Sequence, residues 1–227
     1  VEFVFLVNAV GTLTALVLIA SYAARVTEAA QAALEAERDR SDRLLLNILP
    51  GPIADRLKAG ESTIADGFDG VTVLFADLVG FTTLSQRMPA AELVRLLGDI
   101  FSEFDRLSGE HGLEKIKTIG DAYMAVSGLP VPRLDHAAAA ADMALAMQAA
   151  IARFPSAGPL QMRVGLHSGP VVAGVIGKRK YTYDLWGETV NTASRMESHG
   201  LPGRIQVSDA TRRALGDGYV FEDRGRV

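Results

Sequence analysis

The sequence contains no cysteine, so neither a disulfide framework nor a thiolate metal site can form. It also lacks a surplus of basic residues. Lysine and arginine number 23 against 27 aspartates and glutamates, a net charge of −4 that argues against a general nucleic-acid binder. What the chain does have is length and apolar content: 227 residues, 48% hydrophobic, are enough for one substantial core with accessory segments.

Charged residues are absent from residues 3–24, an apolar run about as long as a bilayer is thick. No basic residue precedes this run, which favours a transmembrane helix over a signal peptide. We expect residues 1–24 to be the last of several spans in a longer membrane protein. Arg25 and the arginines after it predict a cytoplasmic C-terminal side. The competing interpretation is a buried helix of a soluble protein.

Glycine and proline are absent from residues 25–49, which are rich in alanine, glutamate and arginine. Small apolar side chains recur at helical spacing through Val26, Ala29 and Ala33, a pattern typical of a helix that pairs with a copy of itself. An amphipathic helix packed on its own domain is the alternative. Two prolines then interrupt the helix before it resumes. We therefore predict a cytoplasmic helical linker and dimerisation segment over residues 25–58.

A short strand is predicted at residues 71–76, where β-branched and aromatic residues follow one another on both faces. Asp77 ends this run. Burying a carboxylate is costly unless a positive charge compensates it, and Gly80 allows the backbone to turn and present its amides. A metal ion with a phosphate would provide the compensation. The competing interpretation is that Asp77 caps a helix that begins near residues 82–85.

A second acidic residue stands at the tip of a predicted hairpin. Residues 114–128 are typical of strand, Gly-Asp turn and strand, with Asp121 in the turn. If the hairpin lies beside the strand that ends at Asp77, the two carboxylates meet. Together they could hold a pair of Mg²⁺ ions, as in two-metal phosphoryl chemistry.

The rest of the chain alternates between helix and strand patterns. Helices are predicted at residues 89–108, 137–154 and 188–198, and strands at 160–169, 171–176 and 181–184, with a glycine turn between the first two of these strands. This order is α+β. Asn191 and Arg195 lie one turn apart on the last helix and share a face. Taken alone, Asn191, Arg195 and Arg163 are more typical of exposed surface residues. The four histidines are interpreted as structural residues.

Four segments together resemble the signature segments of class III nucleotidyl cyclases, and most closely the membrane-anchored mycobacterial adenylyl cyclases. They are residues 75–82 (FADLVGFT), 115–124 (KIKTIGDAYM), 164–177 (VGLHSGPVVAGVIG) and 180–197 (KYTYDLWGETVNTASRME). The resemblance implies a ferredoxin-like βαββαβ catalytic domain over residues 66–227. Members of this family usually continue into a lysine-containing loop, so we expect the C-terminal end of the domain to be truncated here.

The resemblance also implies roles for particular residues. Asp77 and Asp121, with the backbone carbonyl of Leu78, match the ligands of two Mg²⁺ or Mn²⁺ ions. Arg163 matches an arginine that reaches the nucleotide phosphates. Asn191 matches the residue that orients the ribose, and Arg195 the one that stabilises the charged, phosphorane-like transition state. Backbone amides that could cradle phosphates are those of Leu78, Val79, Gly80, Phe81 and Thr82.

Base selection follows from the chemistry of the nucleobase. Adenine offers an N6 donor and an N1 acceptor, so Lys117 can donate to N1 and Asp184 can accept from N6. In the guanylyl cyclases that resemble this chain, an acid stands at the lysine position and usually a cysteine at the aspartate position. Lys115 and Lys117 are expected to point the same way on their strand, so only the alignment with the family selects Lys117.

These features together predict an adenylyl cyclase that converts ATP to 3′,5′-cyclic AMP and pyrophosphate in signal transduction. One ion would lower the pKa of the ribose 3′-hydroxyl and the other would neutralise the triphosphate. The resemblance implies a head-to-tail homodimer at the plasma (inner) membrane, with two interfacial sites and with lipid around the N-terminal helix. The alternatives are a guanylyl or mixed-specificity cyclase, and a regulatory domain that binds nucleotide without turnover.

Overall fold

The computed structural model describes residues 2–154, 160–177 and 180–225. By its contacts the chain divides into two compact units, residues 1–54 and 55–227, which are described separately below. The second unit carries the sheet and every predicted site residue.

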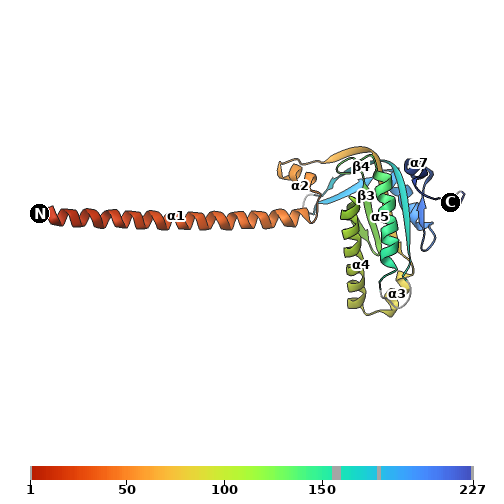
Figure 1. Ribbon diagram of the computed structural model, residues 1–227, viewed down its shortest axis with the longest axis horizontal. Helices are drawn as coiled ribbons and strands as arrows, with labels where there is room; N and C mark the ends of the chain where they lie inside the picture. Colours follow the sequence, from red (N-terminus) through yellow and green to blue (C-terminus); the bar gives the residue numbers. More distant parts are fainter. Residues whose placement is uncertain (1, 155–159, 178–179, 226–227) are drawn as a thin grey trace. The chain divides into compact units, whose positions relative to one another are not determined.

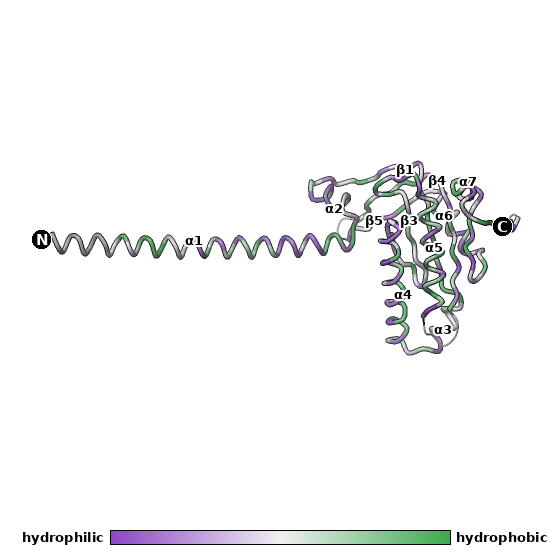
Figure 2. Tube along the Cα trace, in the orientation of Figure 1, coloured by the Kyte–Doolittle hydropathy of each residue, from purple (hydrophilic) through white to green (hydrophobic). Residues whose placement is uncertain are grey.

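The first unit consists mainly of one helix, α1 (Glu2–Leu46), with no break at the predicted boundary between residues 24 and 25. Along the coloured part of α1, hydrophobic residues come first and hydrophilic residues predominate toward the C-terminal end of the helix (Figure 2). The side chains of Leu13, Leu16 and Ile19 are each more than 60% exposed. Within the described part of the chain, α1 is the single helix whose length and hydropathy are sufficient to cross a bilayer. The predicted interruption is found, and α2 (Gly51–Lys58) begins directly after Pro50.

The second unit is built on a six-stranded sheet in the order β2-β3-β1-β4-β5, with β6 beside β4. Among the strand pairs of the described residues, only β4–β6 is parallel. The strands are β1 (Ala65–Leu78), β2 (Glu114–Ile119), β3 (Ala122–Ser127), β4 (Met162–Ile176), β5 (Thr182–Trp186) and β6 (Ile205–Val207). The helices are α3 (Phe81–Arg87), α4 (Ala90–His111), α5 (His136–Ile151), α6 (Glu188–Ser198) and α7 (Asp209–Leu215), followed by the 3₁₀ turn η1 (Gly216–Gly218). Helices α4 and α5 run side by side in this unit (Figure 1). The predicted α+β class is confirmed.

The two faces of the sheet are covered by different helices. Helices α4 and α5 lie against one face, where the alternating inward residues of β1 and β4, such as Leu74 and Leu166, are fully buried with Phe104 and Met143. Helix α6 packs on the opposite face. There a Cβ added at Gly165 would lie 2.1 Å from the backbone nitrogen of Glu197. This close approach sets the position of α6 over the ends of β1 and β4.

Strand β4 differs from its prediction. A glycine turn was expected to divide it in two, but the strand runs without interruption from Met162 to Ile176. The register of β1 against β4 shifts between Phe68 and Val71, where β1 carries a bulge. Pro170 lies opposite that bulge, where the ladder is already disrupted and the missing N–H of proline removes little pairing. Strand β1 is likewise longer than the predicted residues 71–76.

The contact at Gly165 gives a stability prediction. We expect Gly165→Ala to lower the free energy of unfolding by about 3 kcal/mol, because the new methyl group meets helix backbone rather than a mobile side chain. Gly67→Ala in β1 is the matched control, since nothing lies within 4 Å of a Cβ built there. Urea unfolding of both variants measures the difference. Equal stability of the two would contradict the packing of α6 on β4 described above.

Candidate active site

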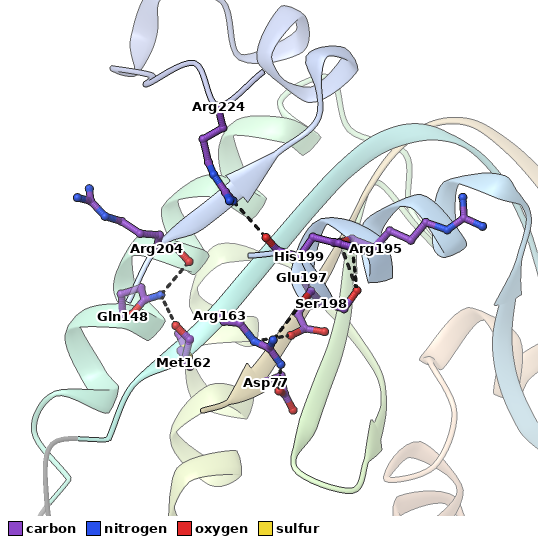
Figure 3. Close-up of polar contacts among 10 residues, drawn as sticks. All are labelled: Asp77, Gln148, Met162, Arg163, Arg195, Glu197, Ser198, His199, Arg204 and Arg224. Atoms are coloured by element: carbon purple, nitrogen blue, oxygen red, sulfur yellow. Dashed lines mark hydrogen bonds and ion pairs between the residues drawn. The ribbon is translucent and has the colours of Figure 1, made fainter. Parts of the chain in front are cut away.

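The ends of β1 and β4 bring Asp77 and Arg163 together. The two residues are direct cross-strand partners, and Nη2 of Arg163 lies 2.6 Å from Oδ2 of Asp77 (Figure 3). Their side chains are 20% and 29% exposed, so the ion pair is largely shielded from water. Helix α3 has Gly80 as its N-cap residue, with no side-chain hydrogen bond to the cap. The alternative in which Asp77 caps this helix is therefore wrong.

Asp121 joins this pair from the hairpin. The register of β3 against β1 places Ala122 opposite Asp77, and Gly120 takes a positive φ of 64° so that the chain turns directly before Asp121. Burial, reinforced by the nearby charge of Asp77 and opposed by Arg163, raises the pKa of the Asp121 carboxyl. The hairpin thus lies beside the strand that ends at Asp77, as the predicted meeting of the two carboxylates requires.

A third carboxylate completes the group. Oε1 of Glu197, on α6, lies 3.2 Å from Nε of Arg163, and the carbonyl oxygen of Ser198 accepts a hydrogen bond from Nη1 of Arg163 at 3.1 Å. Glu197 is only 8% exposed; burial and the charge of Asp77 raise the pKa of its carboxyl. We call Asp77, Asp121, Arg163 and Glu197 the carboxylate cluster.

Sequence reasoning missed Glu197. It follows Thr189 and Ala193 at intervals of four residues, and all three are buried on the face of α6 that meets the sheet. That spacing was the available signal. A glutamate in line with two small buried residues, on a helix whose other face carries Asn191 and Arg195, points inward.

A second polar group lies on β2 and β5. Nζ of Lys117 is 2.5 Å from Oδ2 of Asp184, with the two side chains 37% and 18% exposed. The prediction that Lys115 and Lys117 point the same way is wrong, because the register of β2 against β3 shifts between them. Lys115 instead reaches Asp105 on α4 at 2.7 Å. Of the two lysines, the bulge therefore leaves only Lys117 beside Asp184. The geometry thus distinguishes Lys117 from Lys115 without an alignment to the family.

Helix α6 carries the remaining predicted side chains on its exposed face. Asn191 and Arg195 are both exposed. Figure 3 shows the side chain of Arg195 leading away from Asp77 and Arg163, although Glu197 on the same helix points toward them. Consequently, the predicted metal and phosphate residues lie in one group, and the predicted ribose and transition-state residues on a face directed away from it.

The predicted phosphate loop leaves β1 at Leu78. The backbone N–H of Val79 donates to the carbonyl of Gln161 at 2.8 Å, so this amide already has a partner. Gly80 has a φ of 77° and begins the turn into α3, whose first turn contains Phe81 and Thr82. The amides that open α3 are therefore the better placed part of the predicted cradle.

The cluster suits a divalent cation with oxygen ligands. Asp77 and Asp121 supply hard carboxylate oxygens at one end of the sheet, a donor type that Mg²⁺ and Mn²⁺ accept. Within residues 2–154, 160–177 and 180–225, no three His, Asp or Glu side chains converge as a complete metal cage. Two protein carboxylates with water and substrate phosphates are nevertheless the usual way in which proteins hold Mg²⁺. His167, a structural residue in the prediction, contacts the hydroxyl of Ser208 at 2.6 Å.

Comparison with known proteins identifies the domain. Residues 64–227 match the family model described as the adenylate and guanylate cyclase catalytic domain. The chain is 52% identical over 209 residues to an adenylate cyclase of Mycobacterium tuberculosis strain H37Rv, an alignment that covers 91% of this chain and 47% of that protein. It is 48% identical to retinal guanylyl cyclase 2 of Bos taurus over 203 residues, which is 86% of this chain and 18% of that protein. The chain thus spans less than half of each of these relatives.

A solved structure of a cyclase domain has a similar fold. The crystal structure of the guanylate cyclase domain of RhGC from Catenaria anguillulae, in complex with GTP, superposes with a TM-score of 0.67 at 39% identity, over 68% of this chain and 86% of that one.

Proposed function

This chain belongs to the adenylate and guanylate cyclase catalytic domain family, and from that premise we propose that it converts ATP to 3′,5′-cyclic AMP and pyrophosphate. In this reaction the ribose 3′-oxygen loses its proton and bonds to the α-phosphorus. The bond from that phosphorus to the bridging oxygen of the β-phosphate breaks, and pyrophosphate leaves. A class III adenylyl cyclase of the membrane-anchored mycobacterial type is the corresponding member of the family.

The contact between Lys117 and Asp184 is the observation that carries the choice of base. Their 2.5 Å contact sets one donor and one acceptor side by side, as the N1 and N6 positions of adenine require. Overall sequence identity does not distinguish ATP from GTP as the substrate, since an adenylate cyclase and a guanylyl cyclase match this chain almost equally well. Guanine offers the reverse pattern, which would set donor against donor and acceptor against acceptor, so it should bind less well than adenine.

The carboxylate cluster would bind the metal ions and the triphosphate of the nucleotide. Asp77 and Asp121, with the carbonyl of Leu78, would hold two Mg²⁺ or Mn²⁺ ions, and the ions when bound would supply Lewis-acid activation and charge neutralisation. Arg163 already lies in the cluster and would donate to phosphate oxygens as a bidentate fork. The amides of residues 78–82 would contribute further donors, least of all that of Val79, which donates to Gln161.

A complete site would need two chains. Arg195 points away from the cluster (Figure 3), and Asn191 is exposed one helical turn before it, so neither residue is placed to meet phosphates held by the Asp77 and Asp121 of its own chain. We infer a head-to-tail homodimer in which one chain supplies Asp77, Asp121 and Arg163 and its partner supplies the other four residues, Lys117, Asp184, Asn191 and Arg195. Such a two-fold arrangement creates two equivalent sites. Asn191 would orient the ribose and Arg195 would stabilise charge in the transition state.

The other segments fit a membrane-bound signalling protein. Residues 1–24 would cross the plasma (inner) membrane in contact with lipid, and the exposure of Leu13, Leu16 and Ile19 supports this. Residues 25–58 would form the cytoplasmic linker and dimerisation segment. Residues 66–227 would form the cytoplasmic catalytic domain, and their β1-α4-β2-β3-α5-β4 succession with the order β2-β3-β1-β4 supports the ferredoxin-like description.

A product assay tests the reaction and the base together. We would incubate the full chain with Mn²⁺ and either ATP or GTP at matched concentrations and quantify both cyclic nucleotides. Cyclic AMP as the dominant product is the expected result. Predominant cyclic GMP would favour the guanylyl alternative. Binding of either nucleotide without any cyclic product would favour a regulatory domain, although all seven predicted side chains are present in this chain.

Exchanging the base-recognition residues gives a specific prediction. We expect Lys117→Glu combined with Asp184→Cys to move the preference from ATP toward GTP by about 100-fold or more in the ratio of kcat/KM, since both polar contacts then match guanine. Lys115→Glu combined with Asp184→Cys is the matched control, because Lys115 faces α4 and contacts Asp105. A preference for ATP that survives the first exchange would contradict base recognition by this pair.

A further inference from the structure

Glu197 is a buried carboxylate to which the proposed reaction gives no role. It is 8% exposed and lies within the carboxylate cluster, where its charge adds to those of Asp77 and Asp121. A third negative charge there opposes the binding of a triphosphate and is costly to bury. Its one positive neighbour in the described structure is Arg163.

Arg163 is held from two sides. From β1, Asp77 contacts Nη2 at 2.6 Å; from the last turn of α6, Glu197 approaches Nε at 3.2 Å and the Ser198 carbonyl accepts from Nη1 at 3.1 Å (Figure 3). Under the proposed function, Asp77 is also a metal ligand. An Asp77 carboxylate that holds a cation is less available to Arg163, which then keeps only the two contacts from α6.

Glu197 and Arg163 form an ion pair without a hydrogen bond between them. Oε1 of Glu197 and Nε of Arg163 are 3.2 Å apart, yet neither atom makes a hydrogen bond in this arrangement. Both atoms are buried. A small rotation of the guanidinium as it leaves Asp77 would align the pair and form a charge-assisted bond, which is the stronger kind.

We propose that Glu197 is a positioning residue that anchors Nε of Arg163, so that Nη2, released from Asp77, and the second N–H of Nη1 face the nucleotide triphosphate when Asp77 is engaged by metal. This inference rests on the proposed function. Glu197 itself touches no substrate in it. The backbone of α6 is fixed against Gly165 at the position of Glu197, which makes the anchor rigid.

Nucleotide binding by the full chain tests this role without turnover. The probe is 3′-deoxy-ATP, which lacks the attacking hydroxyl, and 3′-deoxy-AMP is its counterpart without β- and γ-phosphates; both are titrated in Mn²⁺. We expect Glu197→Gln to weaken 3′-deoxy-ATP binding about 10-fold and Arg163→Ala about 100-fold, with 3′-deoxy-AMP little changed. The double variant should match Arg163→Ala, because Glu197 acts through Arg163. Glu188→Gln, an exposed change at the other end of α6, should have no effect.

The outcomes separate this inference from the proposed function. If Arg163→Ala weakens 3′-deoxy-ATP binding but Glu197→Gln does not, the anchor is overturned and the phosphate role of Arg163 stands. A full additional loss from Glu197→Gln in the Arg163→Ala background would also overturn it, because the glutamate would then act elsewhere. If Arg163→Ala has no effect on the binding of 3′-deoxy-ATP, Arg163 does not bind the phosphates, and the positioning role of Glu197 is overturned as well. Thermal melting of each variant confirms that the comparison is made on folded protein.

Discussion

We expect Asp77→Asn to lower cyclic AMP formation by about 1,000-fold or more, in a chain that remains folded. The amide keeps the shape of the side chain but removes the charge that a divalent cation requires, and it weakens the pairing with Arg163 across β1 and β4. Because Asp121 alone would then face the metal, both the activation of the 3′-hydroxyl and the neutralisation of the triphosphate should be lost.

Two measurements check this expectation. Cyclic AMP is quantified with saturating Mn²⁺-ATP, and the rise in melting temperature on adding Mn²⁺ with 3′-deoxy-ATP reports binding. Asp99→Asn on the exposed side of α4 is the control and should retain activity and the thermal shift. If Asp77→Asn kept more than a tenth of the wild-type rate, Asp77 would not be a metal ligand in the reaction.

We expect a mixture of two inactive variants to regain activity. Asp77→Asn damages the carboxylate cluster and Arg195→Ala damages the exposed face of α6, so each homodimer has two defective sites. A dimer with one chain of each kind has one site with both defects and one site with neither. Random pairing makes half the dimers mixed, so co-expression should recover about one quarter of wild-type activity from nearly inactive parents.

The control for this experiment uses two changes in the same cluster. A mixed dimer of Asp77→Asn and Asp121→Asn has one defect in each site, so that mixture should stay inactive. Mixed dimers are isolated with two affinity tags to establish that pairing has occurred. If the isolated dimer of Asp77→Asn with Arg195→Ala were inactive, the division of each site between two chains would be wrong.

Local patterns predicted the elements that carry the site. The helix at residues 188–198 has the predicted bounds, and the Gly120–Asp121 turn joins the two predicted strands. The meeting of Asp77 and Asp121 followed from placing a hairpin beside a buried strand. These features depend on periodicity and turn chemistry, which residues close in sequence determine.

The predictions failed where the structure depends on contacts between residues far apart in the sequence. One bulge lies in β1 opposite Pro170, and the other lies in β2 between Lys115 and Lys117. Each shifts the pairing register of two strands, and the position of the shift depends on the partner strand rather than on a local pattern. The inward position of Glu197 could have been read from its spacing on α6, but its contact with Arg163, which is 34 positions earlier in the chain, could not. The contact between Lys117 and Asp184 likewise joins two strands that are not hydrogen-bonded to each other.

The dependence of specific activity on chain concentration tests the central claim most directly. Cyclic AMP formed from Mn²⁺-ATP per mole of chain is measured over a dilution series that spans dimer dissociation. A site shared between two copies predicts a specific activity that climbs with concentration and then levels off, alongside the dimer fraction seen by sedimentation. Constant specific activity through dilution into monomers would contradict the shared site, and no cyclic AMP at any concentration would contradict catalysis by this chain.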